Sequence, residues 1–360
     1  MIRTYTSVSR YIQGPGALDK IGSVCLEWGK RPLVITDEVL KTILGQRIEN
    51  SFVDANGTLD LVTFPGEVTR PTIDKLAEYA HSVGADVIAG VGGGKALDTA
   101  KAVALAIGSN MISVPTIAST DAPASFAIAV YNDDHLLTEV LKMPRNPDVV
   151  LVDTAVICGA PERFLVAGIG DAISKKFEAE ACAKAGAEML MGGPTTRVGQ
   201  ALSNSCYELI REYALPALES IRKGQPDDNV EALVEATVLL STLSFENGGL
   251  SVSHAIAKGI PLVARAKGTL HGEHVAYGLL VQLTLEDRAP EFILEIIDFY
   301  KQVGLPYSLS QLGLTGSVTE EELAQIGDIA MTSPSAQRFY KKLDSGLIQA
   351  AIISVESSNH

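Results

Sequence analysis

Cysteine is rare in this chain of 360 residues, and long apolar runs are missing from it. The four cysteines form no CxxC pair, which argues against a disulfide framework and indicates reduced, buried thiols at Cys25, Cys158, Cys182 and Cys206. The first residues lack the apolar segment of a signal peptide. The longest uncharged stretch, 102–120, is broken by glycine and proline, so it cannot cross a bilayer as one helix. We expect a soluble, cytoplasmic protein with no membrane partner.

Positive charge is also in deficit. Lysine and arginine number 29 against 43 aspartates and glutamates, which gives a net charge of −14. No basic stripe opposes this total, so the chain as a whole repels a phosphate backbone. Nucleic acid is therefore excluded as a partner, and a hydrophobic content of 46% with 20% charged residues is typical of a globular enzyme.

The length predicts two domains, because one domain usually spans about 100–200 residues. In the first part, short apolar runs alternate with helical patterns at 72–80 and 96–107. This alternation predicts a parallel sheet covered by helices, with strands at 32–36, 59–64, 86–91, 111–114 and 148–152. A hairpin is a further option for 125–140.

After about residue 158 the strand patterns end. Helical patterns follow at 171–185, 197–221, 229–245, 272–286 and 290–303. Thr319 begins one more helix with a capping box. We predict an α/β dinucleotide-binding domain over 1–160 and an all-helical domain over 161–360.

A glycine-rich turn follows the expected strand at 86–91 and opens a helix. Gly92, Gly93 and Gly94 allow a close backbone approach, and the free N–H groups of a helix start suit a pyrophosphate. The turn is neither GxGxxG nor a Walker motif. A merely tight strand-to-helix turn is the alternative.

Two further segments follow strands. Asp37 could bind a ribose and repel a 2′-phosphate, favouring NAD over NADP, or it could cap the next helix. The polar loop 115–125 could hold a nucleotide and a polyol, or it could be a self-capped turn.

Three of the six histidines lie between positions 254 and 274. His254 and His271 lie next to small residues and glycine, and Asp171 is flanked by glycine at the domain junction, where we expect it to begin a helix. Two imidazoles and one carboxylate match a catalytic zinc site, which keeps one position open. The spacing of 83 and 17 residues is no local metal motif, so structural roles remain the alternative, and His274 competes with His271.

These segments occur in an order typical of one enzyme family. The chain resembles the glycerol dehydrogenases among the metal-dependent (group III, iron-containing) alcohol dehydrogenases over most of its length, less so after about residue 290. The resemblance rests on Gly92-Gly93-Gly94-Lys95 with Asp98 and Lys101, Pro115-Thr116 with Thr120-Asp121, Gly170-Asp171-Ala172, Phe177 to Cys182, Ser253-His254-Ala255 and His271-Gly272-Glu273-His274-Val275.

The resemblance implies a dehydroquinate-synthase-like fold and zinc-assisted, NAD-dependent, reversible oxidation of glycerol to dihydroxyacetone. It implies Asp171, His254 and His271 as metal ligands and Asp121 as a contact to the polyol. Ring-like homo-oligomers, often octamers, are expected. The implied cofactor contacts are Asp37, Gly94, Lys95, Ala96, Leu97, Asp98, Thr116, Ile117, Ala118, Ser119, Ser125, Ala127 and Tyr131.

The chain departs from the family pattern at Lys175. Iron-type relatives carry a histidine ligand four residues after the aspartate, so its replacement here favours Zn²⁺ over Fe²⁺ or Mn²⁺. We expect Lys175 and Lys176 to lie on a solvated helix face; an inward Lys175 would instead favour an acidic or phosphorylated substrate. A second departure is Lys258, near which relatives often carry another histidine.

Three other functions compete. A glycerol-phosphate dehydrogenase or a dehydroquinate synthase of the same superfamily would need several inward cations, for which Lys175, Lys258 and Arg265 are candidates. Another polyol or 2-hydroxy-ketone reductase of that superfamily belongs to the same alternative. A non-catalytic nucleotide-binding oligomer would need no Asp/His/His set, and a butanol-type alcohol dehydrogenase would carry the fourth ligand.

Overall fold

The structure is a computed structural model that describes residues 2–133, 136–263 and 268–358. Contacts divide the chain into two compact units. One comprises Thr6–Pro161 and Ser220–Leu239, and the other Met1–Tyr5, Glu162–Glu219 and Leu240–His360. The predicted division into domains over 1–160 and 161–360 stays a prediction.

The first unit is built on a six-stranded sheet with the order β1-β8-β5-β4-β2-β3. Every neighbouring pair is parallel. The α/β class is therefore confirmed, with the strands β1 (Arg10–Gln13), β2 (Pro32–Thr36), β3 (Asp60–Thr63), β4 (Val87–Gly92), β5 (Asn110–Pro115) and β8 (Val149–Val152). All five residues of β2 and all six of β4 are buried, as expected for strands covered on both faces.

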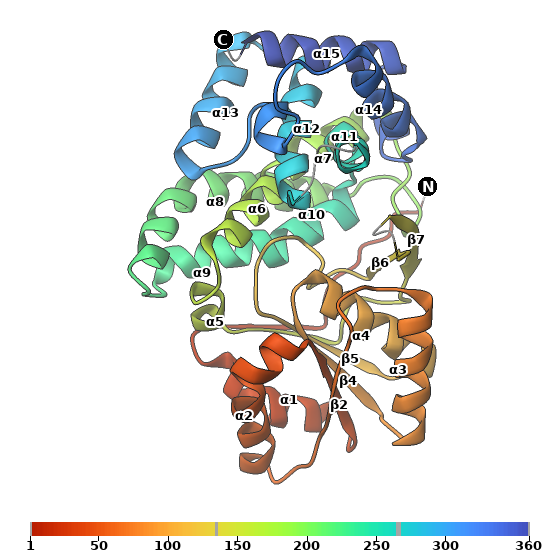
Figure 1. Ribbon diagram of the computed structural model, residues 1–360, viewed down its shortest axis with the longest axis vertical. Helices are drawn as coiled ribbons and strands as arrows, with labels where there is room; N and C mark the ends of the chain where they lie inside the picture. The colour runs from red at the N-terminus through yellow and green to blue at the C-terminus, as the bar shows by residue number, and fades with distance from the viewer. Residues whose placement is uncertain (1, 134–135, 264–267, 359–360) are drawn as a thin grey trace. The chain divides into compact units, whose positions relative to one another are not determined.

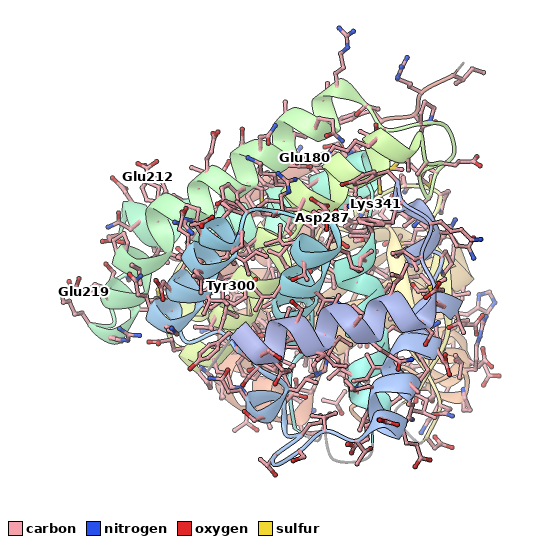
Figure 2. All side chains as sticks on the ribbon, turned by 90° about the horizontal axis from the view of Figure 1, so that it is seen from above. Glu180, Glu212, Glu219, Asp287, Tyr300 and Lys341 are labelled. Atoms are coloured by element: carbon pink, nitrogen blue, oxygen red, sulfur yellow. The ribbon has the colours of Figure 1, made fainter. Side chains whose placement is uncertain are left out.

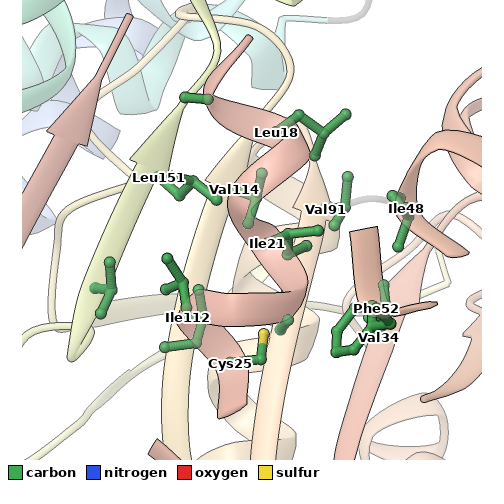
Figure 3. Packing of buried hydrophobic residues seen from close by; sticks show 14 of the residues in the cluster. Leu18, Ile21, Cys25, Val34, Ile48, Phe52, Val91, Ile112, Val114 and Leu151 are labelled. Carbon is green, nitrogen blue, oxygen red and sulfur yellow. The ribbon is translucent and has the colours of Figure 1, made fainter. Parts of the chain in front are cut away.

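Helices cover the two faces of this sheet (Figure 1). On one face, α1 (Ile21–Trp28) and α2 (Glu38–Asp54) pack against alternate strand residues such as Val34, Val91 and Ile112 (Figure 3). On the other face lies α4 (Gly94–Ile107), beside α3 (Arg70–Ser82). There Gly90 has no room for a side chain, because a Cβ would lie 2.6 Å from the Cβ of Ala100. The alternation of β4 thus selects which helix meets which face.

An antiparallel hairpin of β6 (Ala127–Tyr131) and β7 (Leu137–Lys142) follows β5, which confirms the hairpin option. The helices α5 (Thr154–Cys158) and α9 (Asp228–Val234) complete the unit. Glu231 on α9 accepts hydrogen bonds from Gln13 Nε2 at 2.7 Å and from Thr154 Oγ1 at 2.5 Å. These bonds attach a segment from late in the chain to the edge of the sheet.

The second unit is helical. Its centre is α12 (His271–Leu285), which packs against several neighbours, and Tyr300 donates a hydrogen bond to the Ala276 carbonyl at 3.0 Å. Figure 2 shows the side chains of this unit, where Lys341 lies 2.6 Å from Asp287. The other helices are α6 (Glu162–Ile173), α7 (Lys175–Ala185), α8 (Arg197–Arg222), α10 (Ser241–Gly248), α11 (Val252–Gly259), α13 (Pro290–Val303), α14 (Glu320–Thr332) and α15 (Ser345–Ser358).

The helix expected at 290–303 has those bounds, and Thr319 caps α14 as predicted. One expectation was wrong: Asp171 does not begin a helix but lies near the end of α6, because the helical pattern starts earlier, at Glu162. In the described part of the chain, no helix combines the length and apolar character needed to cross a membrane.

Candidate functional site

Three segments expected to bind the cofactor follow neighbouring parallel strands. The strands β2, β4 and β5 lie side by side and end at Thr36, Gly92 and Pro115. Asp37, the glycine turn and the loop from Thr116 come next along the chain. Because parallel strands end at the same edge, the sheet brings these segments together at its carboxyl edge, where ligands of open α/β sheets bind.

The glycine turn has this conformation because its residues carry no side chains. Gly92 has φ +155°, and a Cβ on Gly93 would lie 2.8 Å from Ile117 Cδ1. The amide of Thr116 donates to the Gly92 carbonyl at 3.1 Å, so the turn and the next loop form one packed unit. Gly93 provides no side-chain cap to α4, which leaves the helix start suited to an anion.

Of the two roles expected for Asp37, a ribose contact or a helix cap, the structure shows the cap, at the start of α2. Its Oδ1 accepts a hydrogen bond from the amide of Leu40 at 2.8 Å. A carboxylate has further lone pairs, so a cap is compatible with a ribose contact. That contact stays a proposal.

The other expected cofactor residues divide by environment. Lys95 forms an ion pair with Glu67 at 2.7 Å and lies 6.0 Å from the ring centre of Tyr131. Burial raises the pKa of the Tyr131 hydroxyl to about 12, so it stays protonated at neutral pH. Ala96, Leu97, Asp98, Thr116, Ala118 and Ser125 are buried, whereas Gly94, Ile117, Ser119, Asp121, Ala127 and Tyr131 are partly exposed.

A buried lysine holds the loop that carries Asp121 and Ser125. Lys101 is 0% exposed, and its ammonium donates to the carbonyls of Ala122, Ser125 and Ala127 at 3.0, 3.2 and 2.7 Å. Asp98 Oδ1 lies 2.7 Å from the same nitrogen, and Asp98 Oδ2 accepts from the amide of Ala129. Burial raises the pKa of Asp98, and Lys101 opposes that rise. The pair ties α4 to the loop and to β6.

In the helical unit, the three expected metal ligands lie together. Asp171 comes from α6, His254 from α11 and His271 from the start of α12, and one donor atom from each lies within 4.8 Å of the others. Asp171 is fully buried. The Asp171 Oδ1 atom lies 3.2 Å from His254 Nε2. The donor set and its spacing fit a single divalent ion.

Glycines permit this convergence. A Cβ on Gly272 would lie 1.8 Å from the Ala167 carbonyl oxygen, and one on Gly170 would lie 2.4 Å from the Gly272 oxygen. The helices α6 and α12 therefore touch through their backbones, next to Asp171 and His271. A Cβ on Gly278 would likewise lie 2.3 Å from the Ser253 oxygen, beside His254. Each close contact thus involves the residue directly before or after a candidate ligand: Gly170, Gly272 or Ser253.

Glu178 on α7 orients His254, a role that no pattern in the sequence indicated. Its Oε2 lies 2.7 Å from His254 Nδ1, and its Oε1 accepts from the amides of Ser251 and His254. Burial would raise the pKa of Glu178, but His254 and Lys175 lower it, so the group is ionised. This leaves Nε2 to face Asp171, the arrangement of a carboxylate–histidine–metal site.

The charges of the site are strongly coupled. Burial alone would raise the pKa of Asp171, but Lys175, His254 and His271 lower it. Burial lowers the pKa of His254, whereas Glu178 and Asp171 raise it to about 9. A divalent ion at this site would have to displace that proton, because a metal binds the neutral imidazole.

Lys175 does not lie on a solvated face; that expectation was wrong. Its side chain is 0% exposed, and its Nζ lies 2.7 Å from Asp171 Oδ1 and 3.2 Å from His254 Nε2. Of the two lysines, Lys176 alone is partly exposed. Lys175 follows Asp171 by four residues, about one helical turn, so its side chain lies on the same side as that carboxylate.

His274 does not join the three-residue cluster. Its Nε2 lies 2.7 Å from Thr269 Oγ1, and burial lowers its pKa to about 3. Among the other cations considered, Lys258 is partly exposed with its Nζ 3.4 Å from Thr332 Oγ1, and Arg265 lies outside the described residues.

Comparisons with known proteins show which proteins this chain resembles. The family model for iron-containing alcohol dehydrogenase matches residues 8–154. A glycerol dehydrogenase of Thermotoga maritima is 40% identical over 331 residues, which cover 92% of this chain and 90% of that protein. A glycolaldehyde reductase of Halobacterium salinarum is 38% identical over 315 residues, covering 88% of this chain and 86% of the other.

Solved structures give the same result. A probable glycerol dehydrogenase from Sinorhizobium meliloti superposes with a TM-score of 0.93 at 36% identity and 99% coverage of both chains. Glycerol dehydrogenase from Schizosaccharomyces pombe has a TM-score of 0.95 at 34% identity, covering 99% of this chain and 91% of that one. The chain belongs to the iron-containing, metal-dependent alcohol dehydrogenase family.

Proposed function

We propose that this enzyme oxidises glycerol, or a related vicinal diol, to the hydroxyketone with NAD⁺ as hydride acceptor. Glycerol would give dihydroxyacetone, and the reaction would be reversible. The observation that carries the proposal is the Asp171, His254 and His271 cluster, with donor atoms within 4.8 Å of one another. Full-length similarity to glycerol dehydrogenases supports the substrate class.

The proposed metal is Zn²⁺ rather than Fe²⁺ or Mn²⁺. Asp171, His254 and His271 would hold it, and Glu178 would keep His254 in the tautomer that offers Nε2. Three protein ligands suit a catalytic zinc, and the fourth-ligand position of iron-type relatives is Lys175 here. When bound, the ion supplies a Lewis acid that favours ionisation of a substrate hydroxyl.

The α/β unit would bind NAD. The start of α4 would face the pyrophosphate, and Asp37 would accept from the ribose hydroxyls while disfavouring a 2′-phosphate. Asp121 would orient the polyol by accepting a hydrogen bond from a hydroxyl that does not react. The loop that carries Asp121 is held by Lys101, so the site for the polyol is preorganised.

A homo-oligomer, for which an octamer is the expected form, and a cytoplasmic location complete the proposal. Four free thiols, three of them buried, fit a reducing compartment. Size-exclusion chromatography with light scattering would establish the assembly.

The test is NAD⁺ reduction with glycerol, propane-1,2-diol and 2,3-butanediol, before and after chelation and after Zn²⁺ is restored. We expect turnover of the diols that is lost on chelation and recovered with zinc, and no turnover of glycerol phosphate. Asp171→Ala should abolish turnover. Asp298→Ala, which removes an exposed carboxylate from α13 in the same unit, should leave it unchanged. Chelator-resistant turnover, or a preference for glycerol phosphate, would contradict the proposal.

A further inference from the structure

The ammonium of Lys175 lies among the atoms that would bind the metal. Its Nζ is 2.7 Å from Asp171 Oδ1 and 3.2 Å from His254 Nε2, and these two atoms are themselves 3.2 Å apart. The side chain is fully buried, with the Phe245 ring centre 5.8 Å from Nζ. A full positive charge is thus part of the Asp/His/His cluster.

This contact uses the same atoms that a divalent ion needs. Glu178 engages Nδ1 of His254, so Nε2 is the nitrogen that remains for a metal. A metal that bound Asp171 Oδ1 and His254 Nε2 would have to replace the ammonium in its contacts with these two atoms. Zinc would lie about 2.0–2.2 Å from its nitrogen and oxygen ligands. An ammonium hydrogen-bonded to two of those ligands would also repel the ion at short range.

We propose that Lys175 is an internal cation that competes with the divalent ion for Asp171 and His254, so that metal binding requires the Lys175 side chain to leave this contact. The inference rests on the metal site of the proposed function. It adds that the affinity of the site is set by a residue that is not a ligand.

The chain makes this exchange feasible. A lysine side chain is a flexible stem of four methylenes, so its ammonium can change position more readily than a short, stiff side chain could. Lys175 is also the first residue of α7, where Ser174 separates it from the end of α6. Its departure would leave Asp171 as a buried carboxylate, which the arriving cation would neutralise.

Affinity for the metal alone tests the competition. Zinc dissociation constants of the whole protein, measured against a chromophoric chelator, are compared for the wild type, Lys175→Met and Lys175→Arg. Methionine keeps the length and removes the charge, whereas arginine retains the charge. Lys176→Met is the matched control, because that ammonium lies over the Tyr207 ring instead of at the cluster.

We expect Lys175→Met to bind Zn²⁺ at least about tenfold more tightly than the wild type, and Lys175→Arg and Lys176→Met to show no such gain. Melting temperatures give a second measurement. In chelator, Lys175→Met should melt below the wild type, because Asp171 loses its closest cation, and zinc should raise its melting temperature by the larger amount.

Equal affinity of the wild type and Lys175→Met would overturn the proposal, and weaker binding by the variant would make Lys175 a ligand instead of a competitor. If neither protein binds zinc, both this inference and the metal site fail. If zinc binds but glycerol is not oxidised, the inference stands and only the proposed substrate fails.

Discussion

Glu178 Oε2 lies 2.7 Å from His254 Nδ1, and both side chains are almost fully buried. The contact joins α7 to α11 and fixes the orientation of the His254 ring. Because Glu178 engages Nδ1, the other ring nitrogen, Nε2, is left for the metal. Carboxylates in this position hold the tautomer and orientation of the imidazole.

Replacing Glu178 by alanine should therefore weaken zinc binding by about 10–100-fold. Glu180→Ala is the control, since Glu180 lies on the same helix as Glu178 but pairs with Arg288. Chelator competition measures both. Unchanged affinity in Glu178→Ala would show that His254 is oriented by other contacts.

The crossing of α6 and α12 predicts a second outcome. A Cβ at position 272 would lie 1.8 Å from the Ala167 oxygen, so Gly272→Ala should separate the helices that carry Asp171 and His271. We expect a loss of about 1–3 kcal/mol in the free energy of unfolding and weaker zinc binding. Gly45→Ala is the control, because the nearest atom to its Cβ would be 3.7 Å away. Urea unfolding and zinc titration would reveal a difference, and equal behaviour would refute the close crossing.

Lys101 gives a third prediction. Lys101→Met leaves the carbonyls of Ala122, Ser125 and Ala127 and the Asp98 carboxylate without their cation. It should therefore destabilise the α/β unit by about 3–5 kcal/mol. It should also speed hydrogen exchange of the amides of Ala127 and Ala129. Ile48→Ala weakens the core on the opposite face of the sheet and should leave these two amides protected. Protection that persists in Lys101→Met would mean that the loop does not depend on this ammonium.

His274 predicts a pH dependence of stability. Its pKa is about 3 in the folded protein and 6.5 in the unfolded chain. The unfolded state therefore binds the extra proton first, and stability is lost as the pH falls below 6.5. Between pH 6.5 and 5 the loss is about 1.6 kcal/mol. In urea unfolding with chelator present, His274→Gln should lose about that much less than the wild type, while the exposed His81→Gln behaves as wild type. Parallel profiles for wild type and His274→Gln would contradict this.

Asp37 allows charge and capping to be separated. Asparagine also caps helices, so Asp37→Asn should retain stability while removing the charge that disfavours a 2′-phosphate. We expect the ratio of kcat/KM for NADP to that for NAD to rise. Asp37→Ala should raise the ratio too, but lose about 0.5–2 kcal/mol of stability with the cap. An unchanged ratio in both variants would remove Asp37 from cofactor selection.

Local pattern was sufficient for much of the architecture. Apolar runs separated by helical periods predicted five strands of the sheet, and the limits of α13 followed from Pro290 and the glycine after Val303. These features depend on neighbours in sequence, which is why they can be recognised without a structure. The short strand β1 carried too weak a pattern, since it borders the sheet and is only half-buried.

For the site, the sequence alone nominated the residue types, and a family resemblance selected Asp171, His254 and His271 from them. Only the tertiary structure decided that their donor atoms meet, because the spacings of 83 and 17 residues carry no geometry. It also decided the roles of Lys175 and Glu178. A charged residue on a helix is usually solvated, and its burial becomes favourable only when an opposite charge lies beside it. For Lys175 that partner is Asp171, and for Glu178 it is His254, 76 residues away in sequence.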